Sequence, residues 1–465
     1  MLEVLDRHDP AGLAAFRDAF LGEIILPGDA DYDRVRKVWN GAVDRRPSII
    51  ARCNGTEDVI AAIRYAREHQ LLVAVRGGGH SYPGFSTCDR GIVIDVSRMR
   101  AVHVDPLRRT ARVEGGALLG NLDQAAQEFG LACPVGVVGH TGVGGLTLGG
   151  GLGRLQRKHG LTIDNLLAVD LATADGALLH VSSEQNGDLF WGIRGAGANF
   201  GIVVSFEFAL HPVGPLITQG TVAYPLDRSR DLGQLFREFM LKAPDEITAS
   251  MGFGIASPGQ PFPDALAGKP YVFIGATHSG ALAAAEQDLK PLRALKNPIF
   301  DTFGPKSYLN VQTMLDEIMV WGRRYYTKSG YLATLTDKAL DVCAQLIADS
   351  PGDCTITIQS LGGMIARVPE EAMAFSGRDA AFWLSVLATW NDQADDSRFL
   401  EWGRGAMSTL NQFTTAGAYV NEVMESGRDV TEAIYGKAKV DRLTKLKRTH
   451  DPDNLFRLNQ NILPE

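Results

Sequence analysis

A glycine-rich hexapeptide combines residue types that suit anion binding. Residues 76–81 read Arg-Gly-Gly-Gly-His-Ser and follow a short apolar run. Consecutive glycine N–H groups can turn toward one anion, so this segment predicts a phosphate cradle that holds the histidine against whatever carries the phosphate. A tight turn with an incidental histidine is the alternative. The candidate residues are Arg76, Gly77, Gly78, Gly79, His80 and Ser81.

A second cluster, residues 140–153, contains seven glycines among fourteen residues. This composition is unfavourable for a stable helix or strand. We therefore expect a loop whose backbone lies against a flat ligand. A flexible linker fits poorly because apolar residues are interleaved with the glycines.

The segment near residue 460 brings several amides together. Asn459, Gln460 and Asn461 are consecutive, and Tyr419-Val420-Asn421 lies upstream. Clustered amides can serve the hydrogen-bonding edge of a heterocycle. On their own, such residues are more often capping or surface residues.

Other catalytic motifs are missing or incomplete. The chain has no P-loop, HExxH, GxSxG or EF-hand motif, and residues 79–84 (GHSYPG) miss the nucleophile elbow by one residue. Residues 195–201 (GAGANFG) follow a helix-like or turn-like segment rather than a strand, which argues against a Rossmann fingerprint. The five cysteines are scattered without a CxxC pair, so we expect neither a metal site nor a disulfide framework.

The elements around these motifs alternate between helix and strand. A helix that Thr56 can cap precedes a strand expected over 71–75, and residues 91–97 form another apolar strand. Two hairpins are expected, one that turns at Asp105-Pro106 and one that turns at Asp175-Gly176. A helix is expected over 117–130. Mixed elements of this kind predict an α+β fold.

The chain after residue 213 is poorer in glycine. Helices are expected at about 228–242, 281–296, 334–349 and 396–412, with strand-like runs between them that predict a large sheet. The character of the chain changes again near residue 415. We therefore expect three segments, 1–213, 214–414 and 415–465.

Composition narrows the possible partners. The chain is 45% hydrophobic and 22% charged with a net charge of −8, so neither nucleic acid nor an anionic membrane is an expected partner. The N-terminal sequence lacks the pattern of a signal peptide, and no long uncharged apolar window occurs. A cytoplasmic protein is expected.

Four motifs in register resemble one family. They are RGGGHS, the 140–153 run with RKHGLTIDN (157–165), DLFWGIRGAGANFGIV (188–203), and a DPxNxFxxNQNI tail. Together they resemble the vanillyl-alcohol-oxidase superfamily of flavoproteins, with its PCMH-type FAD-binding domain, and within it the bacterial berberine-bridge-enzyme-like group. The opening, residues 15–53, resembles the enterocin-biosynthesis branch of that group. One departure is His450, where many relatives have tyrosine before the tail motif.

The resemblance implies FAD bound covalently through His80 to the 8-methyl group of the flavin. Such attachment needs a neutral histidine, which is available near pH 7. Many relatives carry a second link from a cysteine, but the motif places that position on Val138, five residues after Cys133. A single link is therefore expected, with Cys133 a packed or loop thiol. The cofactor-binding residues implied are Arg76, Gly77, Gly78, Gly79, Ser81, His140, Thr141, Gly142, Gly144, Gly145, Thr147, Gly150, Gly153, Gly201, Val203, Asn459 and Asn461.

The resemblance also implies roles in catalysis. Thr141 and Leu146 fall on the oxygen-facing side of the flavin, and Tyr419 on a position that serves as base in related bacterial oxidases. Without the family, Tyr419 is an ordinary strand residue. A phenol has a pKa of about 10 and needs help to act as a base at pH 7. Tyr325, Tyr326 or Trp383 could line the pocket, although packing is the simpler reading for each.

The activity implied is that of an FAD-dependent oxidase acting on a small molecule. An alcohol, a phenol-benzylic carbon or a polyketide hydroxyl would give hydride to the flavin, and oxygen would then yield hydrogen peroxide. A dehydrogenase of the same fold, or an oxygenase using a flavin–oxygen adduct, remains open. A flavoprotein that binds a ligand without turnover is the alternative from another class.

Overall fold

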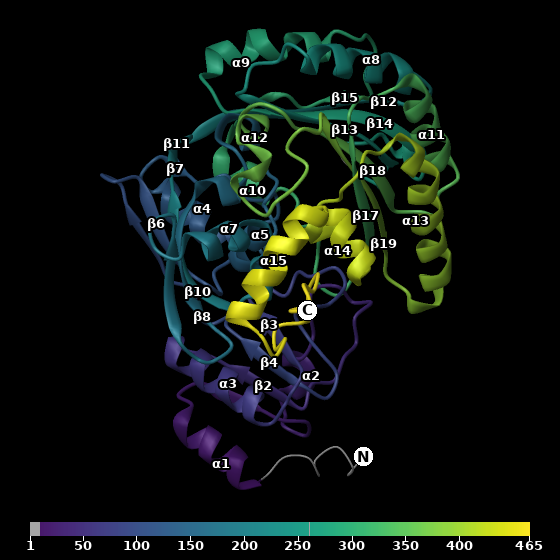
Figure 1. Cartoon of the computed structure of the whole chain (residues 1–465). Coiled ribbons are helices and arrows are strands. Elements are labelled where there is room, and N and C mark those ends of the chain that lie inside the picture. Colours follow the sequence, from purple (N-terminus) through teal and green to yellow (C-terminus); the bar gives the residue numbers. More distant parts are fainter. Residues whose placement is uncertain (1–9, 260) are drawn as a thin grey trace.

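The computed structural model describes residues 10–259 and 261–465, which form three main sheets with flanking helices (Figure 1). The first sheet has strand order β1-β2-β4-β3, with β1 antiparallel and the others parallel. Its strands are β1 (Glu23–Ile25), β2 (Ile49–Arg52), β3 (Val73–Arg76) and β4 (Ile92–Asp95). Its helices are α1 (Pro10–Ala19), α2 (Tyr32–Val35) and α3 (Thr56–Glu68).

The start of α3 differs from the expected cap. Thr56 is the first helical residue, and the N-cap is Gly55, which makes no side-chain cap bond. Instead, the Asp58 carboxylate accepts the backbone N–H groups of Leu21 and Asn54. The carboxylate therefore fixes the segment that leads into the helix, and its negative charge is favourable near the positive end of the helix.

The second sheet is antiparallel with order β5-β6-β10-β8-β9, and both expected hairpins are present as β5/β6 and β8/β9. Its strands are β5 (Val102–Asp105), β6 (Thr110–Glu114), β8 (Leu166–Ala172), β9 (Leu178–Ser182) and β10 (Ile202–Ala209), with the separate pair β7 (Leu131–Ala132) and β11 (His211–Pro212). Its helices are α4 (Leu119–Gln127), α5 (Val143–Leu148), α6 (Gln156–His159) and α7 (Gly187–Ala196).

Helix α5 corrects the expectation of a continuous loop over 140–153. Six residues of the glycine-rich run are helical, and Val143 is fully buried in the core of the second sheet. Tertiary packing therefore overrides the low helix propensity of glycine over this one short segment.

The third sheet has eight antiparallel strands in the order β15-β12-β14-β13-β18-β19-β17, and β16 also pairs with β12. Its strands are β12 (Leu216–Pro225), β13 (Ile247–Ile255), β14 (Pro270–His278), β15 (Phe300–Asp301), β16 (Gly304–Ser307), β17 (Arg324–Leu332), β18 (Cys354–Ser360) and β19 (Phe382–Trp390). The helices of this part are α8 (Ser229–Met240), α9 (Leu282–Leu289), α10 (Tyr308–Thr313), α11 (Asp337–Ala348), α12 (Met364–Arg367) and α13 (Asp396–Leu410).

Helices α8, α9, α11 and α13 cover the outer face of the third sheet (Figure 1). In β18, Cys354, Ile356 and Ile358 enter the core under these helices, which leaves the alternate side chains on the opposite face. The expected helix over 281–296 ends at Leu289 and continues as a 3-10 turn containing Pro291. Proline has no N–H to donate in a helix interior, which accounts for the change.

Helices α14 (Arg428–Tyr435) and α15 (Lys437–His450) return the chain to the first two sheets, and α15 packs against α7 (Figure 1). The fully buried ammonium of Lys447 donates to the Asp451 carboxylate at 2.7 Å and to the carbonyls of Asn199 and Phe456, both at 2.9 Å. The 3-10 helices are η2 (Thr162–Asn165), η3 (Gly197–Asn199), η4 (Leu226–Arg228), η5 (Asp264–Leu266), η6 (Lys290–Arg293), η7 (Glu370–Ala372), η8 (Gln393–Asp395), η9 (Asn411–Phe413) and η10 (Val420–Glu422). No helix of the described residues has the length and apolarity of a membrane span.

Candidate active site

A cavity of about 770 Å³ lies between the glycine-rich segments, the inner face of the third sheet and the returning tail. This volume falls in the range of small-molecule and cofactor sites. Residues far apart in sequence line it, from Trp39 to Gln460. The cavity is therefore assembled by the tertiary fold rather than by any one segment.

The two glycine clusters touch each other backbone to backbone along the cavity. A Cβ atom on Gly78 would lie 2.2 Å from the backbone nitrogen of Gly142, so no side chain fits there. Gly145 also lines the cavity and has nothing within 4 Å of its Cβ position. The missing side chain at Gly78 thus lets the two segments touch, and the missing side chain at Gly145 leaves open space in the cavity.

His80 lies at the cavity wall between aromatic rings. It stacks on Trp39 with ring centroids 4.6 Å apart, and Trp39 stacks in turn on Tyr325 at 3.8 Å. Its Nε2 is 2.7 Å from Nδ1 of His140, while its Nδ1 makes only a 3.4 Å contact with Oγ1 of Thr141. Burial, with a smaller contribution from His140, lowers the pKa of His80 to about 3. The imidazole is therefore neutral at physiological pH.

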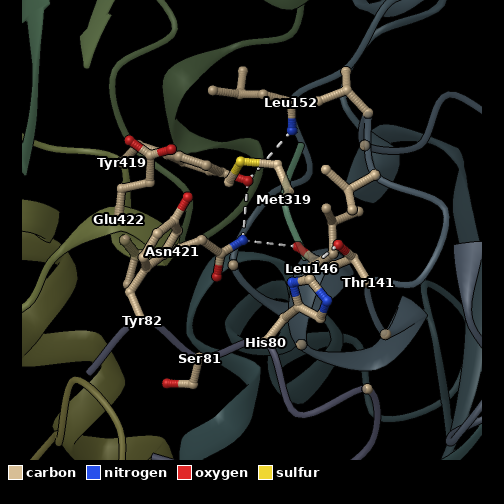
Figure 2. Close-up of a pocket in the computed structure, with 18 of the residues that line it drawn as sticks. His80, Ser81, Tyr82, Thr141, Leu146, Leu152, Met319, Tyr419, Asn421 and Glu422 are labelled. Atoms are coloured by element: carbon tan, nitrogen blue, oxygen red, sulfur yellow. Dashed lines mark hydrogen bonds between the residues drawn. The ribbon is translucent and has the colours of Figure 1, made fainter. Parts of the chain in front are cut away.

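The phenol oxygen of Tyr419 accepts from three N–H donors, and Figure 2 shows two of them, from Leu152 and Asn421. The backbone N–H groups of Gly151 and Leu152 donate at 3.1 and 3.3 Å, and the side-chain amide of Asn421 donates at 2.9 Å. Burial raises the pKa of Tyr419, whereas these three hydrogen bonds oppose that rise. Asn421 also donates to the Leu146 carbonyl at 3.0 Å, which ties the tyrosine segment to the glycine-rich run.

Glu422 is a cavity residue that the sequence analysis did not single out. Its carboxyl group accepts hydrogen bonds from Ser385 at 2.9 Å and Thr327 at 3.4 Å, and Figure 2 shows it beside Tyr419. Burial raises its pKa to about 7, against partial compensation by the two hydroxyls. An acidic residue directly after the Tyr-Val-Asn motif was the available signal.

The roof of the cavity combines many polar side chains with apolar ones such as Phe273, Trp383 and Leu387. Alternate residues of β12, β13, β18 and β19 point away from the helix-covered core and line the cavity, as the period of two in a strand requires. The polar side chains among them are Gln219, Thr221, Thr248, Ser250, Thr355, Thr357, Gln359 and Ser385. Hydroxyls and amides of this kind can hydrogen-bond a polar substrate.

Most of the residues predicted from sequence line this cavity. Those that do are Gly77, Gly78, Gly79, His80, Ser81, Thr141, Gly142, Gly144, Gly145, Leu146, Gly201, Val203, Tyr419 and Asn459. Those that do not are Arg76, His140, Thr147, Gly150, Gly153 and Asn461.

Two of the outlying residues have clear structural roles instead. Arg76 is buried, and its guanidinium donates to the carbonyls of Val35 and Ser86 rather than toward the cavity. Arg76 was expected to bind the cofactor, but its side chain instead joins the start of the glycine-rich segment to the backbone of Val35 and Ser86. His140 acts through its contact with His80.

The two positions considered for a second flavin link, Cys133 and Val138, lie in different surroundings. Cys133 is fully buried in the core of the second sheet, where burial raises its pKa well above the ordinary value. Val138 lines the cavity instead. Trp383 also lines the cavity, whereas Tyr325 stacks on Trp39 and Tyr326 packs into the core of the third sheet.

The lining of the cavity fits a flavin cofactor. Glycine backbone forms much of one wall, and the side-chain oxygens of Asn459 and Gln460 are buried without a hydrogen-bond partner among the described residues. Unsatisfied buried amide oxygens are costly unless a ligand supplies donors. The described residues contain no cluster of metal-ligating side chains. The fold and cavity thus define a two-domain α+β flavoprotein.

Comparison with known proteins gives the family. An FAD binding domain model matches residues 47–182, and a berberine and berberine-like model matches residues 418–463. (R)-6-hydroxynicotine oxidase of Paenarthrobacter nicotinovorans is 32% identical over 96% of this chain and 97% of its own. An FAD-linked oxidoreductase of Dictyostelium discoideum is 30% identical over 97% and 96%.

Solved structures agree with this assignment. That of 6-hydroxy-D-nicotine oxidase from Arthrobacter nicotinovorans has a TM-score of 0.85 at 30% identity, covering 96% of this chain and 98% of that one. Chitooligosaccharide oxidase gives a TM-score of 0.85 at 25% identity, covering 98% and 100%. The chain belongs to the berberine-bridge-enzyme-like family of FAD-linked oxidoreductases.

Proposed function

We propose that this protein is an oxidase that takes hydride from an alcohol, phenol-benzylic or polyketide-type small molecule, with Tyr419 as the base. The observation that carries the proposal is the convergence of three N–H donors on the phenol oxygen of Tyr419. A neutral phenol also carries its own proton, so three donors suit the ionised oxygen better. Hydrogen bonds to the charged form favour ionisation and offset part of the burial effect, which still leaves the pKa of Tyr419 raised.

Tyr419 then accepts the substrate hydroxyl proton at its phenol oxygen, while the polar roof orients the substrate. Asn421 positions the phenol, because its amide bridges the phenol oxygen and the Leu146 carbonyl. FAD, when bound, supplies the hydride acceptor and the means of passing electrons to oxygen. Thr141 and Leu146 are proposed to face the oxygen side.

Covalent attachment of the flavin through His80 is part of the proposal. A neutral imidazole can attack through a nitrogen with a free lone pair. Because Nε2 is engaged with His140 at 2.7 Å, Nδ1 is the nitrogen proposed to form the bond. We propose that residues 1–213 and 415–465 hold the cofactor and that residues 214–414 hold the substrate.

Support for an oxidase comes from the names of two relatives, a 6-hydroxynicotine oxidase and a chitooligosaccharide oxidase. The test is anaerobic mixing of purified protein with a panel of small alcohols and phenols, followed by loss of flavin absorbance. Admission of air should restore the colour rapidly with one peroxide per turnover. Slow reoxidation would identify a dehydrogenase, and product labelled from oxygen gas would identify an oxygenase. Absence of bleaching by any compound would contradict the proposed catalytic function.

A further inference from the structure

The guanidinium of Arg154 lies at the cavity and has no ion-pair partner among the described residues. Arg154 follows directly after the glycine-rich run and lines the cavity. Its Nε and Nη2 atoms are buried and lack a hydrogen-bond partner, and no ion pair joins its guanidinium to another described residue. Removing an ionised group from water without compensation is costly, so this arrangement calls for an explanation.

Two other buried cations of the described residues have a carboxylate partner. Arg378 donates to both carboxylate oxygens of Asp164, at 2.6 and 3.2 Å. Lys447 is paired with Asp451 at 2.7 Å. Arg154 differs from both, since burial lowers its pKa to about 10 with little help from neighbours. It remains protonated at neutral pH, so the cavity wall carries a positive charge.

A second cation strengthens the field on this side of the cavity. Lys306 in β16 donates to Oε1 of Gln219 at 2.6 Å, and Gln219 lines the cavity. Partial burial and, to a smaller extent, the charge of Arg154 lower the pKa of Lys306. The acidic wall residue Glu422 is bonded to Ser385 and Thr327 rather than to either cation.

We propose that Arg154 binds an anionic group of the substrate, and that this group is a carboxylate. The two unpartnered atoms, Nε and Nη2, are neighbours on one edge of the guanidinium and can donate in parallel to the two oxygens of a carboxylate. Lys306 and Gln219 reinforce the same end of the site. The inference rests on the proposed function, since it names the substrate class of that same cavity.

The test measures binding to the flavin-loaded protein. Benzoate, hexanoate and 4-hydroxyphenylacetate are each titrated against the matching primary amide, with the flavin difference spectrum and the thermal midpoint as readouts. At least one carboxylate is expected to bind about tenfold or more tightly than its amide, as a charge-assisted bidentate contact implies. Preference for phosphate or sulfate ions over every carboxylate, or no preference at all, would overturn the proposal. The proposal would also be overturned if the cofactor already occupies the Arg154 guanidinium, in which case no carboxylate would bind.

Arg154→Gln should abolish the preference for carboxylate, and Arg154→Lys should retain part of it. The matched control is Arg108→Gln, which removes one exposed positive charge from the β5/β6 hairpin and should change nothing. Carboxylate preference that survives in Arg154→Gln would contradict the assignment.

Stability separates a binding role from a structural one. Because Arg154 has no partner to lose, Arg154→Gln is expected to unfold at the same temperature as wild type or higher. Arg378→Gln, which strands Asp164, should lower the midpoint. A comparable drop in Arg154→Gln would overturn the proposal. Tyr419→Phe should abolish flavin reduction and keep the carboxylate preference. The role of Tyr419 as base and the role of Arg154 in binding are thus tested separately.

Discussion

The side-chain amide of Asn421 donates to the phenol oxygen of Tyr419 at 2.9 Å, although both residues belong to one short segment of the tail. The same amide donates to the Leu146 carbonyl. Asn421 therefore orients the tyrosine and joins it to the glycine-rich run, where Gly151 and Leu152 supply the other two donors. Two segments far apart in sequence, residues 151–152 and Asn421, therefore hold the phenol oxygen.

Tyr419→Phe should abolish reduction of the flavin by substrate while leaving the cofactor bound. It removes the proposed base and leaves three N–H groups without their acceptor, so stability should also fall by about 1–3 kcal/mol. Stopped-flow flavin absorbance and thermal unfolding check the two effects. Tyr331→Phe is the matched control, because Tyr331 is equally buried in the same cluster but does not line the cavity. Normal flavin reduction in Tyr419→Phe would exclude Tyr419 as the base.

His80→Ala should release the flavin into the supernatant when the protein is precipitated with acid, whereas wild type should retain the yellow colour in the pellet. The reason is that His80 presents a neutral imidazole whose Nδ1 makes only a 3.4 Å contact with Oγ1 of Thr141. Colour in the wild-type supernatant would show that the flavin is not covalently held. Colour retained by the variant would place the bond elsewhere.

Val138→Cys should create a second covalent link to the flavin. Val138 lines the cavity at the position where relatives are expected to carry a linking cysteine, while Cys133 is buried in the core. In the double variant His80→Ala, Val138→Cys, part of the flavin should again stay with the acid pellet. Cys133→Ser is the control and should leave attachment unchanged. Loss of acid-stable colour in Cys133→Ser would reverse this assignment.

The free energy of unfolding of wild type should fall as pH rises through 7, and Glu422→Gln should not show this fall. The pKa of Glu422 is raised from 4.5 to about 7, so the folded state holds its proton more tightly than the unfolded state. Its favourable contribution is complete below pH 4.5 and is lost as pH rises through 7, a change on the order of 3 kcal/mol. Denaturant unfolding at pH 5 and pH 8 should therefore show the variant gaining relative stability at pH 8. The exposed Glu401→Gln should follow wild type at both values. A constant difference between pH 5 and pH 8 would contradict this account.

Local sequence signals predicted much of the fold. The hairpins β5/β6 and β8/β9 follow from turn residues between alternating strands, and the strands of the third sheet follow from their apolar runs. The helix α5 was missed because its stability comes from packing of Val143 rather than from propensity. Thr56 was misjudged because the competing carboxylate, Asp58, gains a partner in Leu21, far away in sequence.

The candidate site shows the same limit. His80 and Tyr419 stand in recognisable motifs, so the sequence was enough to nominate them. Trp39 and Glu422 carry no motif, and their importance depends on contacts with His80 and Ser385 that only the tertiary fold creates. Arg154 is noticed only because no partner surrounds it, a property that a sequence does not display.

The distribution of the cavity over the chain sets an order in time. At roughly 5–20 residues per second on the ribosome, Tyr419 is made about 20–70 s after His80. During that interval the nascent chain has the glycine cradle but neither the phenol nor the amides of Asn459 and Gln460. Lys447 of helix α15, which binds the Asn199 carbonyl and the Asp451 carboxylate, also emerges only after Tyr419. The proposed bond between His80 and the flavin would therefore form late, after completion of the tail rather than after synthesis of the glycine-rich segment.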